Sequence, residues 1–254
     1  MRQRRESVYL DWSDPIFTER IPDYSDYWNG TDNEPQWEET LKEYPNDASV
    51  KYYLENPIHY KKNTNFFRSP DNYDTQERGN MFLGCSHTFG TGHHLENVWS
   101  YKLSKYLGGK FFNLANGGAG FMYQYRVFKH WIDKLNVDNV FMFQQESPRW
   151  DLYGKNLNRD MWVQVGLWGP IPEDQQAYSL LTSDESNFIV QEAILNAIKY
   201  ECQERGIDFY FESYTPINIE RGLKARDLMH YTVSQQHELF KTFRSKFYHK
   251  NTWK

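Results

Sequence analysis

The chain has 254 residues and a formal net charge of −5 at pH 7. This length suits one large domain or two small ones. A protein whose main partner is nucleic acid usually carries a basic stripe, and the sequence has no long basic run, so nucleic acid is not an expected partner. No apolar stretch approaches the ~20 residues that span a bilayer, so no membrane partner is expected either.

Two cysteines, Cys85 and Cys202, are too few for a disulfide framework, and both are expected to be reduced. The first six residues carry positive charge, but no apolar segment follows them, so no secretory signal is expected. These features predict a cytoplasmic location. The sequon Asn29-Gly30-Thr31 is then expected to be only a turn.

Residues 1–78 differ from the rest of the chain. They are rich in Asp, Glu, Pro, Asn and aromatic residues, and short helices are expected only at 37–44 and 48–55. The many aromatic side chains indicate that this segment packs onto something. We therefore predict an irregular N-terminal arm or cap over 1–78, packed on a main domain at 79–254, with its aromatic surface available to a protein partner.

From residue 80 onward, short apolar runs alternate with amphipathic segments. Strands are predicted at 81–83, 110–114, 140–144 and 207–211, and helices at 96–107, 121–135, 185–205 and 233–247. This alternation predicts an α/β fold, a three-layer α/β/α sandwich of the flavodoxin-like kind with a central parallel sheet. An insertion at about 150–186 is expected to be a lid, a binding loop or an interface.

A serine follows the first predicted strand. The apolar run Met81–Leu83 stops at Gly84, and Ser86 comes two residues later. In open α/β sheets, ligands bind outside the carboxyl ends of the strands, so this turn would lift the Ser86 side chain above the sheet edge. The alternative is an ordinary strand-to-turn segment with an incidental serine.

Near the other end of the chain, Asp227 precedes His230 by three residues. A serine hydroxyl is a poor nucleophile at neutral pH and needs a base, usually histidine. That base needs a group that fixes its tautomer and stabilises the imidazolium. One loop with Asp227 and His230 can supply this pair; the alternative is a helix-capping Asp beside a surface His.

These segments resemble the conserved blocks of the SGNH (GDSL-like) hydrolases, a family of serine esterases. The run from Gly84 to Gly90 is similar to the first block, with Cys85 where many members have aspartate. The run 113–118 is similar to the second block, and Asp227-x-x-His230 is similar to the last. The resemblance extends from about residue 57 to 243.

The segment before the nucleophile strand adds to this resemblance. Asn63 and Arg68 are similar to an Asn and an Arg that precede that strand in some members. The chain is also similar to signal-less SGNH-like proteins of marine bacteriophages. A phage-encoded protein would act in the virion or in the host cytoplasm.

The resemblance implies Ser86 as nucleophile, His230 as general base and Asp227 as its orienting partner. It implies the backbone N–H groups of Ser86 and Gly118 as oxyanion donors. No cofactor is expected. The implied activity is ester cleavage through an acyl-enzyme, with a small-molecule or glycan ester as substrate. Carbohydrate O-acetyl groups are the favoured substrate, and an O-acyltransferase would use the same residues.

The family's third block, Gly-x-Asn-Asp, is missing from this chain. The predicted strand at 140–144 runs instead into Gln145 and Glu146. We predict that the amide of Gln145, or failing it Gln144, replaces the missing asparagine donor. Because this block is missing, the sequence is also compatible with a second class of function. The protein would then be a binding or structural module, such as a virion component, with weak or absent hydrolysis.

Several other residues have two interpretations. His87, His93 and His94 suggest a metal site, but no acidic or cysteine partner stands at a ligand-like spacing, so no metal is expected. Cys85 is a rival nucleophile. Arg149 either contacts an anionic or sugar substrate or pairs with a loop carboxylate. Aromatic residues of the insertion either stack on sugar rings or form a satellite core: Trp150, Tyr153, Trp162 and Trp168.

Overall fold

The computed structural model describes residues 26–70, 72–73, 76–144, 149–154, 161–165, 184–213 and 222–251. Its centre is a four-stranded sheet in the order β2-β1-β3-β6, and every neighbouring pair is parallel. The strands are β1 (Arg78–Leu83), β2 (Lys110–Asn113), β3 (Asn136–Phe143) and β6 (Asp208–Glu212).

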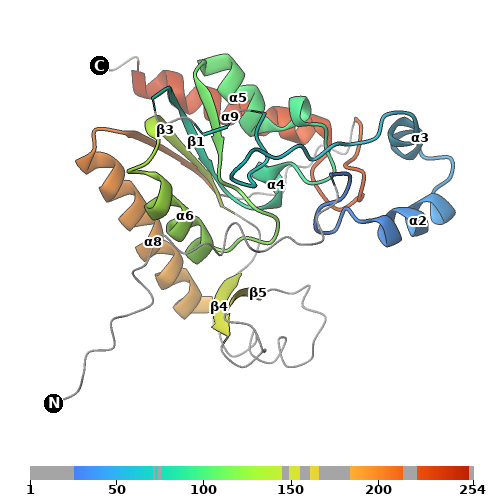
Figure 1. Ribbon diagram of the computed structural model, residues 1–254, viewed down its shortest axis with the longest axis horizontal. Helices are drawn as coiled ribbons and strands as arrows, with labels where there is room; N and C mark the ends of the chain where they lie inside the picture. The colour runs from blue at the N-terminus through green and yellow to red at the C-terminus, as the bar shows by residue number, and fades with distance from the viewer. Residues whose placement is uncertain are drawn as a thin grey trace.

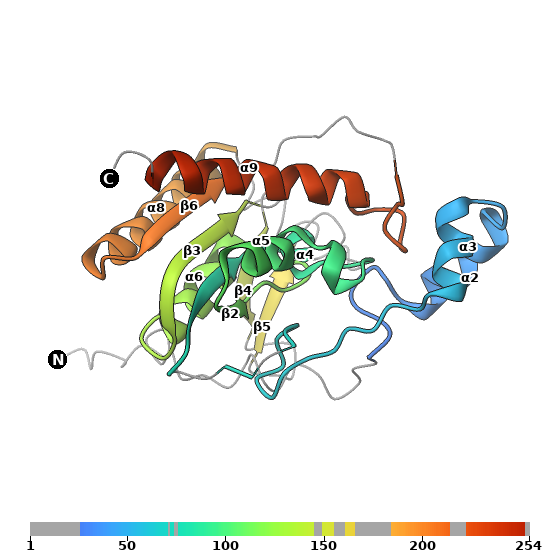
Figure 2. The same ribbon diagram turned by 90° about the horizontal axis from the view of Figure 1, so that it is seen from above.

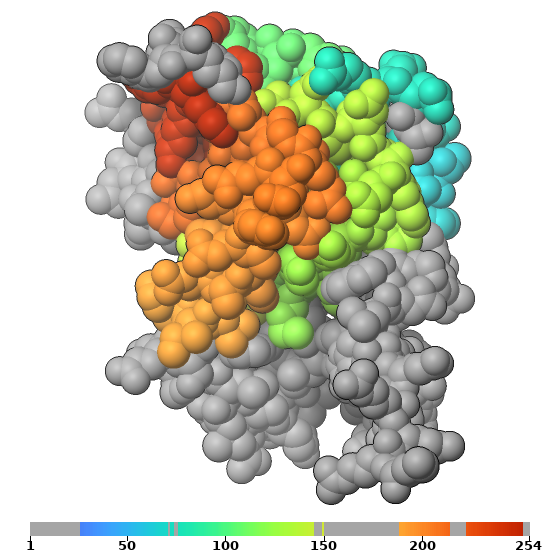
Figure 3. All heavy atoms as spheres, turned by 90° about the vertical axis from the view of Figure 1, so that its left-hand side faces the viewer, coloured from blue at the N-terminus to red at the C-terminus, as the bar shows by residue number. Residues whose placement is uncertain are grey.

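Helices cover both faces of this sheet (Figures 1 and 2). The helices α5 (Trp99–Leu107) and α9 (Val233–Asn251) pack on one face. The helices α6 (Phe121–Trp131) and α8 (Asp184–Glu204) pack on the other, and Figure 3 shows α8 spread over that side of the molecule. The predicted α/β/α sandwich is confirmed. Within the described residues, no helix is long and apolar enough to cross a membrane.

The apolar residues of β1 pack against the helices on both faces of the sheet. Met81 and Leu83 belong to the core under α6 and α8, whereas Phe82 belongs to the core under α5 and α9. Successive side chains of a strand point to opposite faces, so a strand covered on both sides reads as a continuous apolar run. The same division holds in β3, where Met142 and Phe143 face opposite layers.

Two strands begin earlier than the apolar pattern predicts, because polar side chains extend them. The β1 residue Asn80 is buried and accepts a hydrogen bond from the Asn139 side chain of β3 at 2.8 Å. Its own amide donates to the Gly108 carbonyl at 2.9 Å. Hydrophobicity alone does not register two polar side chains that bond to each other inside a sheet, so it places both strand starts too late.

Helix bounds also differ from the sequence prediction. The expected helix at 96–107 is divided into the 3₁₀ turn η2 (Leu95–Asn97) and α5, because Val98 between them has an extended backbone with ψ of 134°. The helix α6 stops at Trp131 rather than at residue 135. The insertion contains an antiparallel hairpin of β4 (Trp150–Gly154) and β5 (Met161–Val165). The side chains of this hairpin, and Trp168, lie outside the described residues.

The N-terminal segment carries two short helices, α2 (Glu34–Glu43) and α3 (Ala48–Glu55). Asn33 and Asp47 cap them, since their side chains accept backbone N–H bonds of 3.0 and 2.7 Å at the first turns. Tyr53 of α3 donates to the Lys224 carbonyl at 3.0 Å. The segment therefore contacts the loop before α9; the domain boundary at residue 78 stays a prediction.

The turn after β1 depends on glycine. Gly90 ends α4 (Ser86–Phe89) in the left-handed region with φ of 87°. A Cβ atom there would lie 2.2 Å from Val98 Cγ2 and 2.9 Å from Arg68 Nη1.

We predict that Gly90→Ala lowers the free energy of unfolding well beyond Gly206→Ala. The two positions have similar positive φ, 87° and 67°, which costs an L-residue about 1–2 kcal/mol. A Cβ at Gly206 meets nothing within 4 Å, whereas overpacking at Gly90 adds about 1–3 kcal/mol. Urea unfolding of both variants measures the difference. Equal destabilisation would contradict the packing argument.

Candidate active site

Ser86 lies beyond the carboxyl end of β1 and opens α4. It lines a pocket of about 530 Å³ and is 6 % exposed. As the first helical residue, it has a backbone N–H without a partner inside the helix. Gly84 permits the tight turn, because a Cβ there would lie 2.1 Å from Thr88 Oγ1.

Asp227 and His230 meet as the sequence prediction requires. Nδ1 of His230 lies 2.6 Å from Oδ2 of Asp227, whose side chain is fully buried. Leu228 has a left-handed backbone with φ of 55°, and this turn brings the backbone N–H of Met229 to Asp227 Oδ1 at 3.1 Å. A left-handed non-glycine residue is a strained feature that clusters at functional sites.

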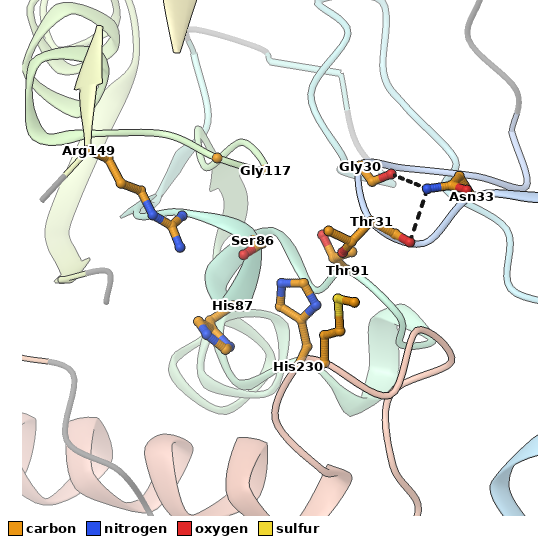
Figure 4. A pocket seen from close by; sticks show the side chains of 11 residues that line it. Gly30, Thr31, Asn33, Ser86, His87, Thr91, Gly117, Arg149 and His230 are labelled. Carbon is orange, nitrogen blue, oxygen red and sulfur yellow. Dashed lines mark hydrogen bonds between the residues drawn. The ribbon is translucent and has the colours of Figure 1, made fainter. Parts of the chain in front are cut away.

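The charge of Asp227 fixes the tautomer of His230. Burial by itself raises the pKa of the Asp227 carboxyl, but hydrogen bonds from His230, Thr31 and Met229 together with the charge of His230 outweigh it, and the net pKa is lowered. An ionised carboxylate only accepts, so Nδ1 of His230 carries the proton and Nε2 is left to accept one. Ser86 and His230 line the same pocket (Figure 4). The Ser86 hydroxyl lies 3.9 Å from Cys85 Sγ, and among the described contacts no hydrogen bond joins it to His230.

Thr31 is a site residue that the sequence analysis missed. Its hydroxyl donates to Oδ2 of Asp227 at 2.6 Å, from a position 196 residues away in the chain. The turn expected at Asn29-Gly30-Thr31 is confirmed, with a bridge between Asn29 and Asp32. The sequence predicted this turn, but only the fold shows that its Thr31 hydroxyl contacts the Asp227 carboxylate. Gly30, Thr31 and Asn33 also line the pocket.

A buried ion pair holds this turn in place. Arg226 donates to both oxygens of Asp32 at 2.7 and 2.8 Å, and the two side chains are 3 % and 1 % exposed. The Tyr60 hydroxyl donates to Asp32 as well and accepts the Gly92 N–H at 2.7 Å. Buried charges are tolerated only when such further hydrogen bonds satisfy them. Because Arg226 and Asp32 adjoin Asp227 and Thr31, the pair sets their contact.

Arg68 supports the loop that follows Ser86. It is fully buried and donates to the carbonyls of Phe89, Gly90 and His93 at 3.2, 2.5 and 2.6 Å. Its guanidinium also lies 4.5 Å from the ring centroid of Tyr60. The arginine noted before β1 therefore holds this loop in place through its hydrogen bonds.

The histidines of that loop serve different contacts. Nε2 of His93 lies 2.5 Å from the Tyr231 carbonyl, so it must carry the proton, because a carbonyl only accepts. The ring of His94 stacks on Tyr53, and the ring of His87 lies 4.3 Å from that of Tyr231. Across the described residues, no three His, Cys, Asp or Glu side chains are grouped as metal ligands.

The structure gives a different outcome for each of the remaining predicted site residues. Gly118 lines the pocket with φ of 76°, and its role as an oxyanion donor stays a prediction. The fallback to Gln144 is wrong, because its amide donates to Gln191 of α8 at 3.2 Å. Gln145 lies outside the described residues. Cys85 is buried in the core under α6 and α8, so it cannot act as the rival nucleophile.

No protein-family model matches this chain, and no curated protein matches it. Among solved structures, a proposed lipolytic protein of the G-D-S-L family from Desulfitobacterium hafniense DCB-2 is 16 % identical, with a TM-score of 0.32, over 68 % of this chain and 99 % of its own. A proposed acylhydrolase from Bacteroides fragilis NCTC 9343 is 13 % identical, with a TM-score of 0.32, over 81 % of this chain and 98 % of its own. Both TM-scores are low, so the chemistry of the site is inferred from its own residues.

Burial of His93 predicts an acid-sensitive fold. Desolvation lowers the pKa of its imidazole to about 3, although the bond to Tyr231 acts in the opposite direction. Unfolded histidine has a pKa of ~6.5. Between these values only the unfolded chain binds the proton, so stability falls as pH falls, by up to about 1.4 kcal/mol per pH unit.

We predict that His93→Gln flattens this dependence, since glutamine keeps an N–H donor for Tyr231 but does not titrate. Urea unfolding at intervals from pH 7 to pH 4 measures the slope for the wild type and the variant. The exposed His59→Gln serves as control and keeps the wild-type slope. An unchanged slope in His93→Gln would show that this imidazole does not govern the acid sensitivity.

Proposed function

We propose that this protein is a serine hydrolase that cleaves an ester through an acyl-enzyme on Ser86. The observation that carries the proposal is the 2.6 Å contact between His230 Nδ1 and the buried Asp227 carboxylate, at a pocket that Ser86 also lines. A buried carboxylate that orients a histidine beside a serine is the arrangement that serine nucleophiles use on unrelated folds.

In this mechanism the Ser86 hydroxyl attacks the ester carbonyl while Nε2 of His230 takes its proton. Asp227 stabilises the imidazolium that forms. The backbone N–H groups of Ser86 and Gly118 hold the oxyanion of the tetrahedral intermediate. His230 then gives its proton to the departing alcohol, and a water molecule, activated by the same histidine, releases the acyl group from Ser86.

The proposed substrate is an O-acyl group on a polar alcohol, with carbohydrate O-acetyl esters as the favoured class. Apart from Met229, the described lining consists of polar, charged and glycine residues. Such a lining supports hydroxyl-rich substrates over long acyl chains, which need apolar walls. An O-acyltransferase, in which a sugar hydroxyl replaces water, would use the same residues.

One observation favours the second candidate, a binding module with weak or absent hydrolysis. The Gln144 amide bonds to α8, so this residue does not supply the donor that the third family block provides. Loss of one side-chain oxyanion donor costs ~10²–10³-fold in turnover. The two candidates differ in whether Ser86 is activated, and this can be measured directly.

A fluorophosphonate probe tests that activation. We expect the wild type to become covalently labelled, because an activated serine displaces fluoride from phosphorus, and Ser86→Ala to remain unlabelled. Ser104→Ala, which removes a buried serine of α5 outside the pocket, is the matched control and should label like the wild type. A folded wild-type protein that takes no label would favour the binding module.

The Thr31 hydroxyl should contribute to the same reactivity. Thr31→Val keeps the side-chain shape but removes a hydrogen bond to a charged group, worth about 1.5–3 kcal/mol, so we predict at least a roughly tenfold slower labelling rate. Thr31→Ser keeps the hydroxyl and should restore most of the rate. The exposed Thr64→Val is the control for the substitution itself. Equal rates for Val and Ser at position 31 would refute a positioning role.

A further inference from the structure

The described lining of the candidate pocket differs in charge from the chain as a whole. The chain carries a formal net charge of −5, yet no carboxylate is among the described residues that line the pocket. The Asp227 carboxylate behind His230 has no exposed surface and is already bonded to Thr31 and His230. Of the described lining side chains, Arg149 is the one with a permanent charge.

Arg149 also has a defined place within the pocket. Figure 4 shows its side chain extended toward Ser86, on the side of Gly117. Gly30, Thr31 and Asn33 lie on the other side of the serine. An ester whose carbonyl is at Ser86 would therefore place one of its two ends toward the guanidinium.

The groups that a guanidinium binds indicate which chemical group that end of the ester carries. Its planar fork of N–H donors matches the paired oxygens of a carboxylate, sulfate or phosphate group. The side chain of Arg149 is partly buried, which strengthens an ion pair relative to one in open water. Because the protein as a whole is acidic, an anionic substrate needs such a local cation to be held.

We propose that Arg149 binds an anionic group on the ester substrate, so that the site prefers short polar esters with a negative charge near the scissile bond. This inference rests on the proposed hydrolase function and deepens it. Arg149 acts here as a specificity-determining residue. The cleavage itself is the one already described: Ser86 forms the acyl bond, and the alcohol leaves with the proton from His230.

Matched pairs of esters test this specificity. On the alcohol side, 3-acetoxybenzoate is compared with its neutral methyl ester; on the acyl side, mono-4-nitrophenyl succinate is compared with 4-nitrophenyl butyrate. The quantity measured is the ratio of kcat/KM for the anionic ester to that for its neutral partner, in the full-length wild type and in Arg149→Met. The matched control is Arg78→Met, which removes an equal charge at the start of β1, the strand end opposite to Ser86.

We expect the wild-type ratio in at least one pair to fall tenfold or more in Arg149→Met, mainly through KM, and to shrink with added salt. The pair that responds identifies the end of the ester that carries the anion. Arg78→Met should keep the wild-type ratio. Ratios in both pairs that Arg149→Met leaves unchanged would overturn the inference, and so would an equal fall in Arg78→Met.

The same assays separate this inference from the proposed function. If Ser86→Ala abolishes cleavage of the neutral esters but Arg149→Met leaves both ratios unchanged, the hydrolase stands and the anion specificity is wrong. If the wild type cleaves none of the four esters and takes no fluorophosphonate label, the hydrolase itself is wrong, and the anion preference falls with it.

Discussion

The buried ion pair between Asp32 and Arg226 is the contact on which the candidate site depends. It joins the N-terminal segment to the loop before α9, across 194 positions of the chain. Removing one partner of such a pair leaves an uncompensated buried charge and costs about 3–5 kcal/mol. Each partner adjoins a site residue, so the pair also places Thr31 against Asp227. The ion pair therefore contributes both to the attachment of the N-terminal segment and to the geometry of the Asp227–His230 contact.

Polar contacts of the same kind join the two loops that carry Ser86 and His230. Tyr60 bonds to Asp32 and to the Gly92 N–H, while the Gly92 carbonyl accepts the Arg226 N–H at 2.9 Å. His93 reaches the Tyr231 carbonyl next to His230. These buried bonds replace the regular ladder of a sheet in a region where the chain is irregular. Side chains held in this way are fixed in advance, which the proposed hydrolysis would require for electrostatic stabilisation of its transition state.

The apolar sheet and the polar site have different physical origins. The sheet is held by burial on both faces, through residues such as Met81 and Phe82, and tolerates shifts in helix ends. The site is held by hydrogen bonds, which have narrow geometric limits. No carboxylate is among the described residues that line its pocket. The guanidinium of Arg149, in the described lining of that pocket, connects its architecture to the class of ester proposed for it.

The sequence by itself determined the α/β class, most of the strands and helices, and the pairing of Asp227 with His230. These follow from local signals: apolar periods of 2 and 3.6 residues, glycines at turns, and residue types suited to proton transfer. The structure places Ser86 and His230 at one pocket, and the action of the three residues as a triad stays a prediction. The sequence missed the polar first half of β1, residues 78–80, and the hairpin in the insertion, because hydrophobicity does not register paired polar side chains or short isolated strands. The prediction for Gln144 was wrong because the direction of its side chain is set by a hydrogen bond to Gln191 of α8, a helix far along the chain. Only the tertiary structure decided that Thr31 meets Asp227, since no local pattern records a contact between residues separated by most of the chain.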